Sequence, residues 1–275
     1  MKRICRLWLT AVVACALSGC MHVWTWGDDA AAQPRMLVTS QASIAAQTLA
    51  PTGVLRVGVY KGSPTSMVVV QGQNHGIAHD LGHLLGERLG VPVQIVEFPR
   101  VAEVVNAVHD GRVDFTFTNA SASRAKLVDF TPTLVRLELG LLVPKTSAIK
   151  NFADLDRPGV RLGVSQGSSS QTTLGAKLKQ AVIRPQPSLS VAKQLLEQGE
   201  LDAFATNKGI LFELADQLPQ HHVLDDAWGH EQLAIAIPMG RTSAMPWLQG
   251  FAAEAVQQDT LQRMAQQAGL RGLAR

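Results

Sequence analysis

A strand–helix rhythm that runs twice along the chain constrains the fold more than any other feature of the sequence. From residue 54 onward, short segments rich in Val and Ile alternate with segments whose apolar residues recur at helical spacing. This order favours right-handed crossovers and predicts a mainly parallel sheet. The expected strands of the first run are 54–60, 91–98 and 113–118, and the expected helices are 77–89 and 101–108.

The same rhythm begins again after residue 139, which indicates a second sheet. An apolar segment at 233–237 could carry the chain back to the first sheet, and 243–270 reads as helical. We therefore expect two α/β lobes, 54–138 plus 231–275 and 139–230, that close on a solute by bending at the two crossings. Ligands of open α/β sheets bind beyond the carboxyl ends of the strands, so the cleft between the lobes is the expected binding site. The expected strands of this run are 139–143, 160–165, 182–185, 201–206 and 222–224, and the helices are 168–179, 190–198 and 208–217.

The N-terminus has the three-part pattern of a secretory signal. Lys2, Arg3 and Arg6 precede a short apolar stretch, 7–17, which is shorter than the roughly 20 residues that cross a bilayer. Leu17-Ser18-Gly19-Cys20 resembles a bacterial lipobox, which implies cleavage after residue 19 and a lipid on Cys20. Cleavage without lipidation is the alternative. Residues 20–53 would then form a tether, and we expect a membrane-anchored lipoprotein of the periplasm.

Removal of the signal changes the charge and the cysteine content. The full chain has a formal net charge of +3, and the three basic residues of 1–19 account for all of it. A nucleic-acid-binding patch is therefore not expected. Cys20 would be the last of the 3 cysteines, which excludes an internal disulfide and a thiolate zinc site.

Four segments resemble the bacterial extracellular solute-binding proteins of family 3. Residues 76–81 (Gly-Ile-Ala-His-Asp-Leu) look like the opening of the family's first helix, and 201–207 resemble its Leu-Asp-Ala strand. Residues 114–131 are similar to its strand, Thr-x-x-Arg turn and Asp-Phe segment, although the turn is two residues shorter here. Residues 163–170 resemble its second-lobe glycine–serine loop. The resemblance runs in order from about residue 55 to 270.

This resemblance implies a type II periplasmic-binding-protein fold and a solute-binding subunit of an ABC transporter. The expected partners are a small polar solute, carboxylate-bearing and related to amino acids, and a membrane permease. A monomer without cofactor is expected. In the family the arginine of the turn holds the ligand's carboxylate, which assigns that role to Arg124. A solvated surface arginine beside Lys126 is the structural alternative.

The resemblance implies further ligand contacts at matching positions, and each of these residues could instead have a purely structural role. Tyr60, Thr118, Asn119 and Ser121 are expected from the first lobe, where Tyr60 could instead pack in the core and the polar residues could form a turn. Ser169 and Ser170 are expected from the second lobe, where a hydroxyl could instead cap a helix.

Asn207 stands where amino-acid binders of the family usually have an aspartate for the α-ammonium. Either the solute lacks that group, or another acid such as Glu97 pairs with it. Lys208 makes the surroundings still less negative.

Catalysis and metal binding have little support in the sequence. A dehydratase or lyase on this fold would need a positioned acid or base, for which Glu97 and Asp225 are weak candidates. A sensor subunit would bind in the same way and signal to a receptor. The pair His79 and His83 has helical spacing but matches no zinc pattern, so no metal is expected.

Overall fold

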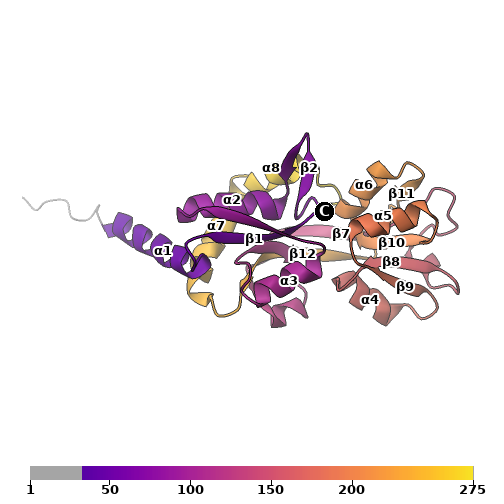
Figure 1. Cartoon of the computed structure of the whole chain (residues 1–275), viewed down its shortest axis with the longest axis horizontal. Coiled ribbons are helices and arrows are strands. Elements are labelled where there is room, and N and C mark those ends of the chain that lie inside the picture. Colours follow the sequence, from indigo (N-terminus) through magenta and orange to yellow (C-terminus); the bar gives the residue numbers. More distant parts are fainter. Residues whose placement is uncertain (1–32, 275) are drawn as a thin grey trace, which may run out of the picture.

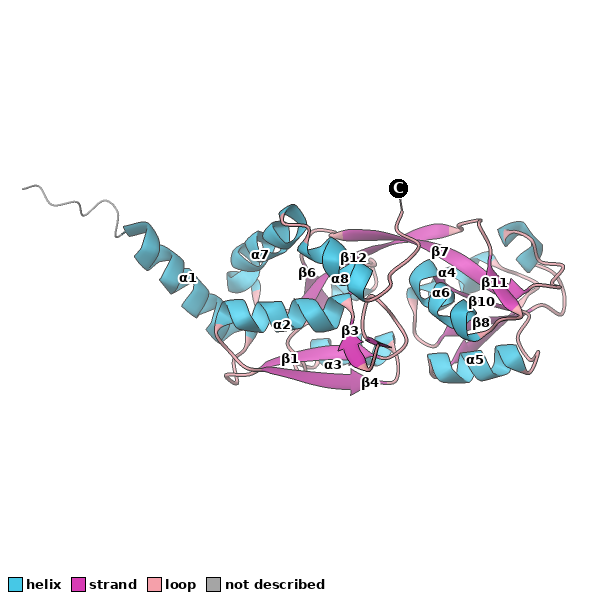
Figure 2. Cartoon of the chain, turned by 90° about the horizontal axis from the view of Figure 1, so that it is seen from above, coloured by secondary structure: helices cyan, strands magenta, loops and turns pink. Residues whose placement is uncertain are grey.

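The computed structural model describes the backbone of residues 33–274 and the side chains from residue 41 onward. The predicted signal at 1–19 and the predicted lipidation site at Cys20 lie outside the described residues. Two α/β bodies lie side by side and are joined by two long strands, β7 (Val135–Pro144) and β12 (Gly229–Pro238) (Figures 1 and 2).

The first lobe contains a parallel strand pair with helices on both faces. β1 pairs with β4 in register from Leu55↔Val93 to Tyr60↔Phe98, and a bridge from Val57 to Phe115 extends the sheet toward β5. The bounds are β1 Leu55–Tyr60, α2 Ile77–Leu89, β4 Val93–Phe98, α3 Val101–His109, β5 Thr116–Asn119 and β6 Val128–Phe130, with α7 Met245–Gln257 and α8 Thr260–Gln267 completing the lobe (Figure 2).

The second lobe repeats this design. Strands β10, β8 and β9 are parallel, while β11 and the far half of β7 add antiparallel strands. The bounds are β7 Val135–Pro144, β8 Arg161–Ser165, α4 Ser169–Lys177, β9 Val182–Gln186, α5 Leu189–Glu197, β10 Ala203–Asn207, α6 Lys208–Gln217, β11 His221–Val223 and β12 Gly229–Pro238.

Strands β7 and β12 connect the lobes. They pair antiparallel from Gly229↔Leu139 to Leu233↔Val135. Beyond this segment β12 pairs with β5 and β6 of the first lobe, while β7 pairs with β10 and β11 of the second. The proposed lobe boundaries, 138/139 and 230/231, fall within the segment where the two strands pair.

The structure corrects the expectation of a soft leader up to residue 53. Residues Gln33–Leu49 form a helix, α1, whose C-terminal end is buried against the first lobe. Ala45 and Leu49 are four residues apart and lie on one face, with Ala50 following. The hairpin of β2 (Val68–Val70) and β3 (Gln73–His75), which projects beside α2 in Figure 1, was also not predicted.

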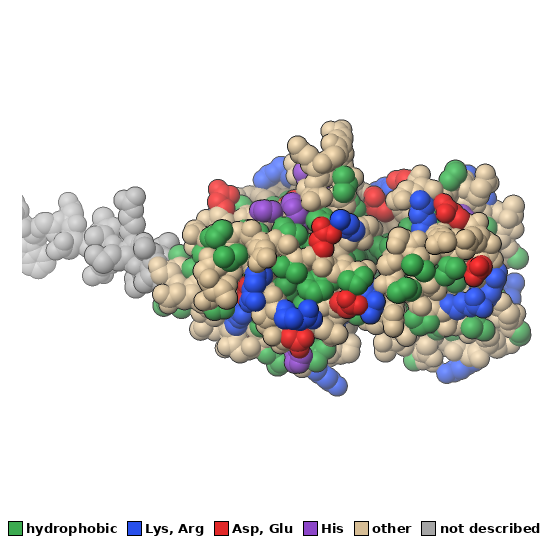
Figure 3. All heavy atoms as spheres, viewed as in Figure 1, with side chains coloured by type: hydrophobic (Ala, Val, Ile, Leu, Met, Phe, Trp, Pro, Cys, Tyr) green, Lys and Arg blue, Asp and Glu red, His purple; other side chains and the backbone are tan. Residues whose placement is uncertain are grey.

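The two lobes are in direct contact across the cleft. Tyr60 and Val104 of the first lobe belong to one apolar cluster with Leu189 and Phe204 of the second. Gly167 in the second lobe approaches so closely that an added Cβ would lie 2.6 Å from the Cβ of Ala102 in the first. The space-filling view shows the two bodies meeting at a shallow indentation (Figure 3). The structure is therefore a closed arrangement of the lobes.

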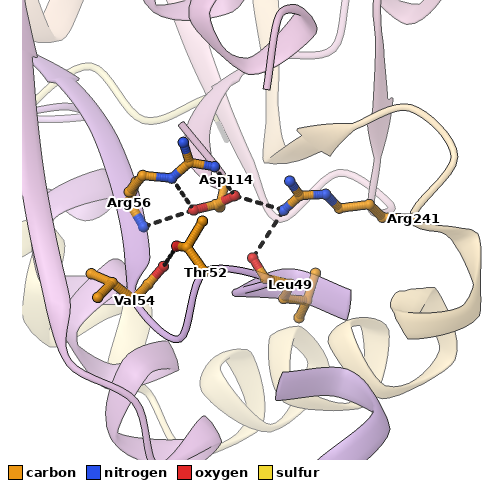
Figure 4. Close-up of polar contacts among 6 residues, drawn as sticks. All are labelled: Leu49, Thr52, Val54, Arg56, Asp114 and Arg241. Carbon is orange, nitrogen blue, oxygen red and sulfur yellow. Dashed lines mark hydrogen bonds and ion pairs between the residues drawn. The ribbon is translucent and has the colours of Figure 1, made fainter. Parts of the chain in front are cut away.

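A fully buried carboxylate, Asp114, lies just before β5 and connects this segment with β1 and with the segment that follows β12 (Figure 4). It accepts hydrogen bonds from Nε and Nη2 of Arg56 at 2.8 and 2.7 Å and from the Arg56 backbone N–H at 3.0 Å. Nη1 of Arg241 donates to it at 2.8 Å and also to the carbonyl of Leu49, at the end of α1, at 2.9 Å. Two arginines thus compensate one buried negative charge.

We predict that Asp114→Ala lowers the free energy of unfolding by ~3 kcal/mol, because it leaves two partly buried guanidinium groups without their acceptor. Urea unfolding followed by circular dichroism measures this. The control is Glu254→Ala, which removes the exposed ion pair with Arg88 and should cost less than ~1 kcal/mol. Equal losses in the two variants would contradict the role assigned to Asp114.

We predict that Gly167→Ala lowers the population of the closed arrangement by roughly tenfold or more, because overpacking costs ~1–3 kcal/mol and the Cβ of Ala102 cannot rotate away. Distances between spin labels on the two lobes report that population. The matched control is Gly199→Ala, which has a similar positive φ (67° against 72°) but no heavy atom within 4 Å of the added Cβ. Identical distance distributions in the two variants would show that the contact does not limit closure.

Candidate functional site

A cavity lies between the lobes, at the end of strands from both. Its volume is about 30 Å³, room for roughly two water molecules, so the lobes must separate before a solute can enter. Polar side chains dominate the lining, as expected for a polar solute. The polar and charged lining residues are Tyr60, Thr65, Arg100, Thr118, Asn119, Arg124, Ser165, Ser168, Ser188, Thr206, Asn207 and Glu231.

Arg124 is a buried cation in this cavity, with an exposed fraction of 7%. It begins a short 3₁₀ turn, Arg124–Lys126, that follows β5. Its Nη1 donates to Oγ1 of Thr118 at 2.8 Å and to the carbonyl of Asn119 at 3.5 Å. Burial lowers the pKa of the guanidinium, although the negative charge of Glu231 acts in the opposite direction. The solvated surface alternative for Arg124 therefore does not describe this side chain.

Glu231 is the buried anion of the same cavity, and the sequence analysis missed it. It lies on β12, in register with Leu137 of β7, and is 8% exposed. Asn207 Nδ2 donates to its Oε2 at 3.0 Å, and Ser169 Oγ donates to its Oε1 at 3.3 Å. Burial raises the pKa of the carboxyl, and Arg124 and the two hydrogen bonds only partly offset this.

Asn207 serves two neighbours at once. Its Oδ1 accepts from the backbone N–H of Ile210 and caps α6, while its Nδ2 donates to Glu231. Lys208, expected to reduce the negative character of this region, points away from the cavity. Its ammonium donates to Glu138 Oε2 and to the carbonyl of Asp225, both at 2.7 Å.

A hydrogen-bonded chain crosses from one lobe to the other beside the cavity. Asn119 Nδ2 donates to Ser169 Oγ at 3.1 Å, and the hydroxyl of Ser169 in turn donates to Glu231. The Oδ1 of Asn119 accepts from the backbone N–H of Gln232 at 3.0 Å. Polar groups of both lobes and of β12 thus interlock when the lobes meet.

Tyr60 closes the first-lobe side of the cavity. Its hydroxyl donates to Ser63 Oγ at 3.2 Å, and Ser63 is hydrogen-bonded to Thr65 at 2.9 Å. Burial raises the pKa of the phenol. Tyr60 lines the cavity and also packs in the cluster with Leu189, so the packing alternative describes it, while its contact with a ligand stays a prediction.

Neither of the two serines expected from the second lobe is a lining residue of the cavity. Ser169 lies beside it, hydrogen-bonded to Asn119 and Glu231, and Ser170 is buried away from it. Ser168, which was not expected there, caps α4 by accepting from the Gln171 N–H at 3.1 Å and lines the cavity. Ser121 is not a lining residue. Its Oγ accepts from the Arg124 N–H at 3.4 Å, which is turn chemistry.

Arg100 is a second lining residue that the sequence analysis missed. It pairs with Glu103 at 2.6 Å and donates from Nη1 to the carbonyl of Pro187 in the other lobe at 3.3 Å. Its buried Nε has no hydrogen-bond partner among the described residues.

The acids proposed from sequence lie elsewhere. Glu97 is about half exposed, pairs with Lys61 at 2.8 Å and lines an outer groove rather than the cavity. Asp225 is exposed.

The histidines considered as metal ligands are paired with other side chains. The Nδ1 atom of His79 is 2.7 Å from Asp80 Oδ1, and the rings of His79 and His83 touch. Within residues 33–274, no group of three or more His, Cys, Asp or Glu side chains is arranged to hold a metal ion.

Comparisons with known proteins agree with this geometry. The sequence model of the bacterial extracellular solute-binding proteins, family 3, matches residues 55–269. The glutamine-binding protein of Geobacillus stearothermophilus is 25% identical over 252 residues, covering 85% of this chain and 93% of that protein. The ABC transporter glutamine-binding protein GlnH of Bacillus subtilis is 28% identical over 120 residues, covering 44% of each chain.

Among solved structures, an ancestral amino acid-binding protein, a precursor of cyclohexadienyl dehydratase, superposes with a TM-score of 0.70. It is 26% identical, and the match covers 80% of this chain and 97% of that one. The resemblance inferred from the four sequence segments and the predicted type II periplasmic-binding-protein fold are both confirmed.

Proposed function

Because this chain belongs to family 3 of the bacterial extracellular solute-binding proteins, we propose that it captures a small carboxylate-bearing solute, an amino acid or a related organic acid. Members of this family bind small molecules and work with the permeases of ABC transporters. In the function proposed for the present chain, the captured solute is delivered to such a permease.

The single observation that carries the carboxylate proposal is the buried guanidinium of Arg124. Only one of its terminal nitrogens is used in hydrogen bonds with described residues, and the side chain lines the cavity. A guanidinium presents a planar fork that matches both oxygens of a carboxylate. Removing this cation from water is costly unless an anion compensates it, so an anionic group of the solute is the natural partner.

Binding is favoured over catalysis at this site. The curated relatives are named as binding proteins, and the ancestral neighbour is itself described as amino acid-binding. Glu231 is the one acid among the described residues that line the cavity, and its raised pKa would suit a general acid. A dehydratase on this cleft would therefore use Glu231 rather than Glu97 or Asp225, and it would consume the solute that it binds. A sensor would hold the solute as a transport protein does, so sequencing the neighbouring genes would separate the two: genes for a permease and an ATPase there would favour transport.

We also propose a periplasmic lipoprotein, since the segment before Cys20 has the pattern of an export signal. Within residues 33–274 no helix is long and apolar enough to span a membrane. The α1 helix packs on the first lobe from Ala45 onward, so the tether would lie before it.

We predict that the exported chain begins at Cys20 and carries lipid on its thiol. Mass spectrometry of the protein purified from membranes should show an acylated N-terminal cysteine. Cys20→Ala, which removes the only thiol of the proposed mature chain, should release the chain from the membrane. A soluble, unmodified wild-type chain would count against the anchor.

We predict that Arg124→Ala weakens solute binding by ~2–5 kcal/mol, because it removes one half of a buried charge pair. Arg124→Lys should recover only part of this, since an ammonium cannot form the fork. A thermal-shift screen of amino acids and organic acids identifies the solute, because a ligand that binds only the folded state raises the apparent melting temperature. Titration of the variants then gives the loss.

Lys126→Ala is the matched control, because Lys126 belongs to the same turn and is exposed. It should bind as the wild type does. Mass spectrometry of the recovered solute separates binding from turnover. The proposal fails if uncharged sugars alone raise the melting temperature and Arg124→Ala leaves that effect intact.

A further inference from the structure

Two buried side chains of opposite charge face the same small cavity without meeting. Arg124 and Glu231 both line it and are 7% and 8% exposed. Their charges influence each other, yet no ion pair of 4.0 Å or less joins these two described residues. The cavity therefore has a cationic wall and an anionic wall, with space between them.

The carboxylate of Glu231 is only partly satisfied by the protein. A carboxylate accepts about four hydrogen bonds, and each of its oxygens here receives one, from Ser169 Oγ and from Asn207 Nδ2. Both donors are neutral, so they orient the carboxylate without cancelling its charge. A buried carboxylate with neutral donors alone pays a desolvation cost, which agrees with the raised pKa of this group.

The cations around the cleft, as far as the structure describes them, are committed to other acids. Arg100 pairs with Glu103 at 2.6 Å, Lys208 with Glu138 at 2.7 Å and Lys61 with Glu97 at 2.8 Å. Glu97, the acid considered from sequence as a replacement for a missing aspartate, already has its partner and lies outside the cavity. Glu231 is thus the acid that the cavity offers to a solute.

We infer that Glu231 binds a cationic group of the solute, so that the solute is a small zwitterion held between Glu231 and Arg124. This inference rests on the proposed function, because Arg124 supplies the anionic end. It narrows the solute from carboxylates in general to those that also carry an ammonium group. Asn207, which has no charge to offer, positions Glu231 by donating to it, and Ser169 does so from the second lobe.

The location of Glu231 couples recognition of the cation to the hinge. The residue lies on β12 within the segment that pairs with β7, opposite Leu137. Its two donors, Ser169 and Asn207, belong to the second lobe, and Ser169 reaches the first lobe through Asn119. A cation bound at Glu231 is therefore enclosed only when the lobes come together.

The test compares matched pairs of compounds that differ only in the amino group. L-glutamine with glutaramate, L-alanine with propionate and L-cysteine with 3-mercaptopropionate are titrated calorimetrically into the mature wild-type protein and into Glu231→Gln. We expect the wild type to prefer the amino member of the pair that fits. Glu231→Gln should weaken that member by at least about 30-fold while changing the other by less than about threefold.

Two further variants keep the outcome interpretable. Glu97→Gln is the matched control and should leave both affinities unchanged. The double variant Asn207→Asp/Glu231→Gln returns a carboxylate to the cavity beside an amide, so it should recover part of the preference for the amino compound. Recovery would exclude a loss caused only by altered packing.

The results separate this inference from the proposal it rests on. If wild-type protein binds the carboxylates without preference for the amino member, or if Glu231→Gln keeps the wild-type preference, Glu231 does not bind a cation and the inference is wrong. The carboxylate proposal would still stand in either case, provided that Arg124→Ala weakens binding to the extent predicted above. If no carboxylate of either kind binds, both fail together.

Discussion

Both lobes depend on the antiparallel pairing of β7 with β12. The two strands pair from residue 135 to 139 and from 229 to 233, and each then continues into a different lobe. The apolar residues of β12 pack in the first core, with Leu233, Ile235 and Ile237, whereas Leu141 and Val143 of β7 pack in the second. These two clusters lie in different lobes, so bending at the shared segment can move the lobes as bodies without disrupting either cluster. The contacts of Tyr60 and Val104 with the second-lobe residues of their shared cluster would have to part.

Closure of the lobes by this bending depends on the charged groups of the cavity. In an open cleft, water would solvate both Arg124 and Glu231. In the closed arrangement the two groups are buried around a cavity of about 30 Å³, and the pKa of Glu231 rises because its charged form loses hydration. An acid whose pKa is higher in the closed arrangement than in the open one destabilises the closed arrangement as the pH rises through that higher pKa. Ionised Glu231 thus destabilises the closed arrangement when no solute is bound. A bound cation would compensate its charge and remove this destabilisation.

Local pattern was sufficient for most elements. The helix expected at 77–89 has these bounds because Ile77, Leu81, Leu85 and Leu89 lie on its buried face and Gly90 adopts the left-handed conformation that ends it. The hairpin of β2 and β3 was missed because it exposes much of its surface and has polar residues where a core strand would be apolar. The α1 helix was missed because its sequence has little apolar periodicity, and Ala45 and Leu49, which pack on the first lobe, are only two residues of its apolar face.

The residues of the candidate site likewise divide into those that were predicted and those that were missed. The resemblance of short segments to family 3 assigned eight ligand-binding positions. The structure brings five of them around one cavity, while their contacts with a solute stay predictions: Tyr60, Thr118, Asn119, Arg124 and Asn207. The other three, Ser121, Ser169 and Ser170, are not lining residues.

The sequence alone therefore determined the order of strands and helices apart from α1 and the β2–β3 hairpin, together with the two crossings and the turn that contains Arg124. The tertiary structure decided which acid the cavity contains. Glu231 stands near the start of a long strand, between His230 and Gln232, where alternating side chains suggest an ordinary solvated edge. It becomes a buried anion only because Asn207 and Ser169 approach it from segments distant in sequence. Contacts of this kind depend on how the lobes pack, so they cannot be predicted from a local sequence pattern.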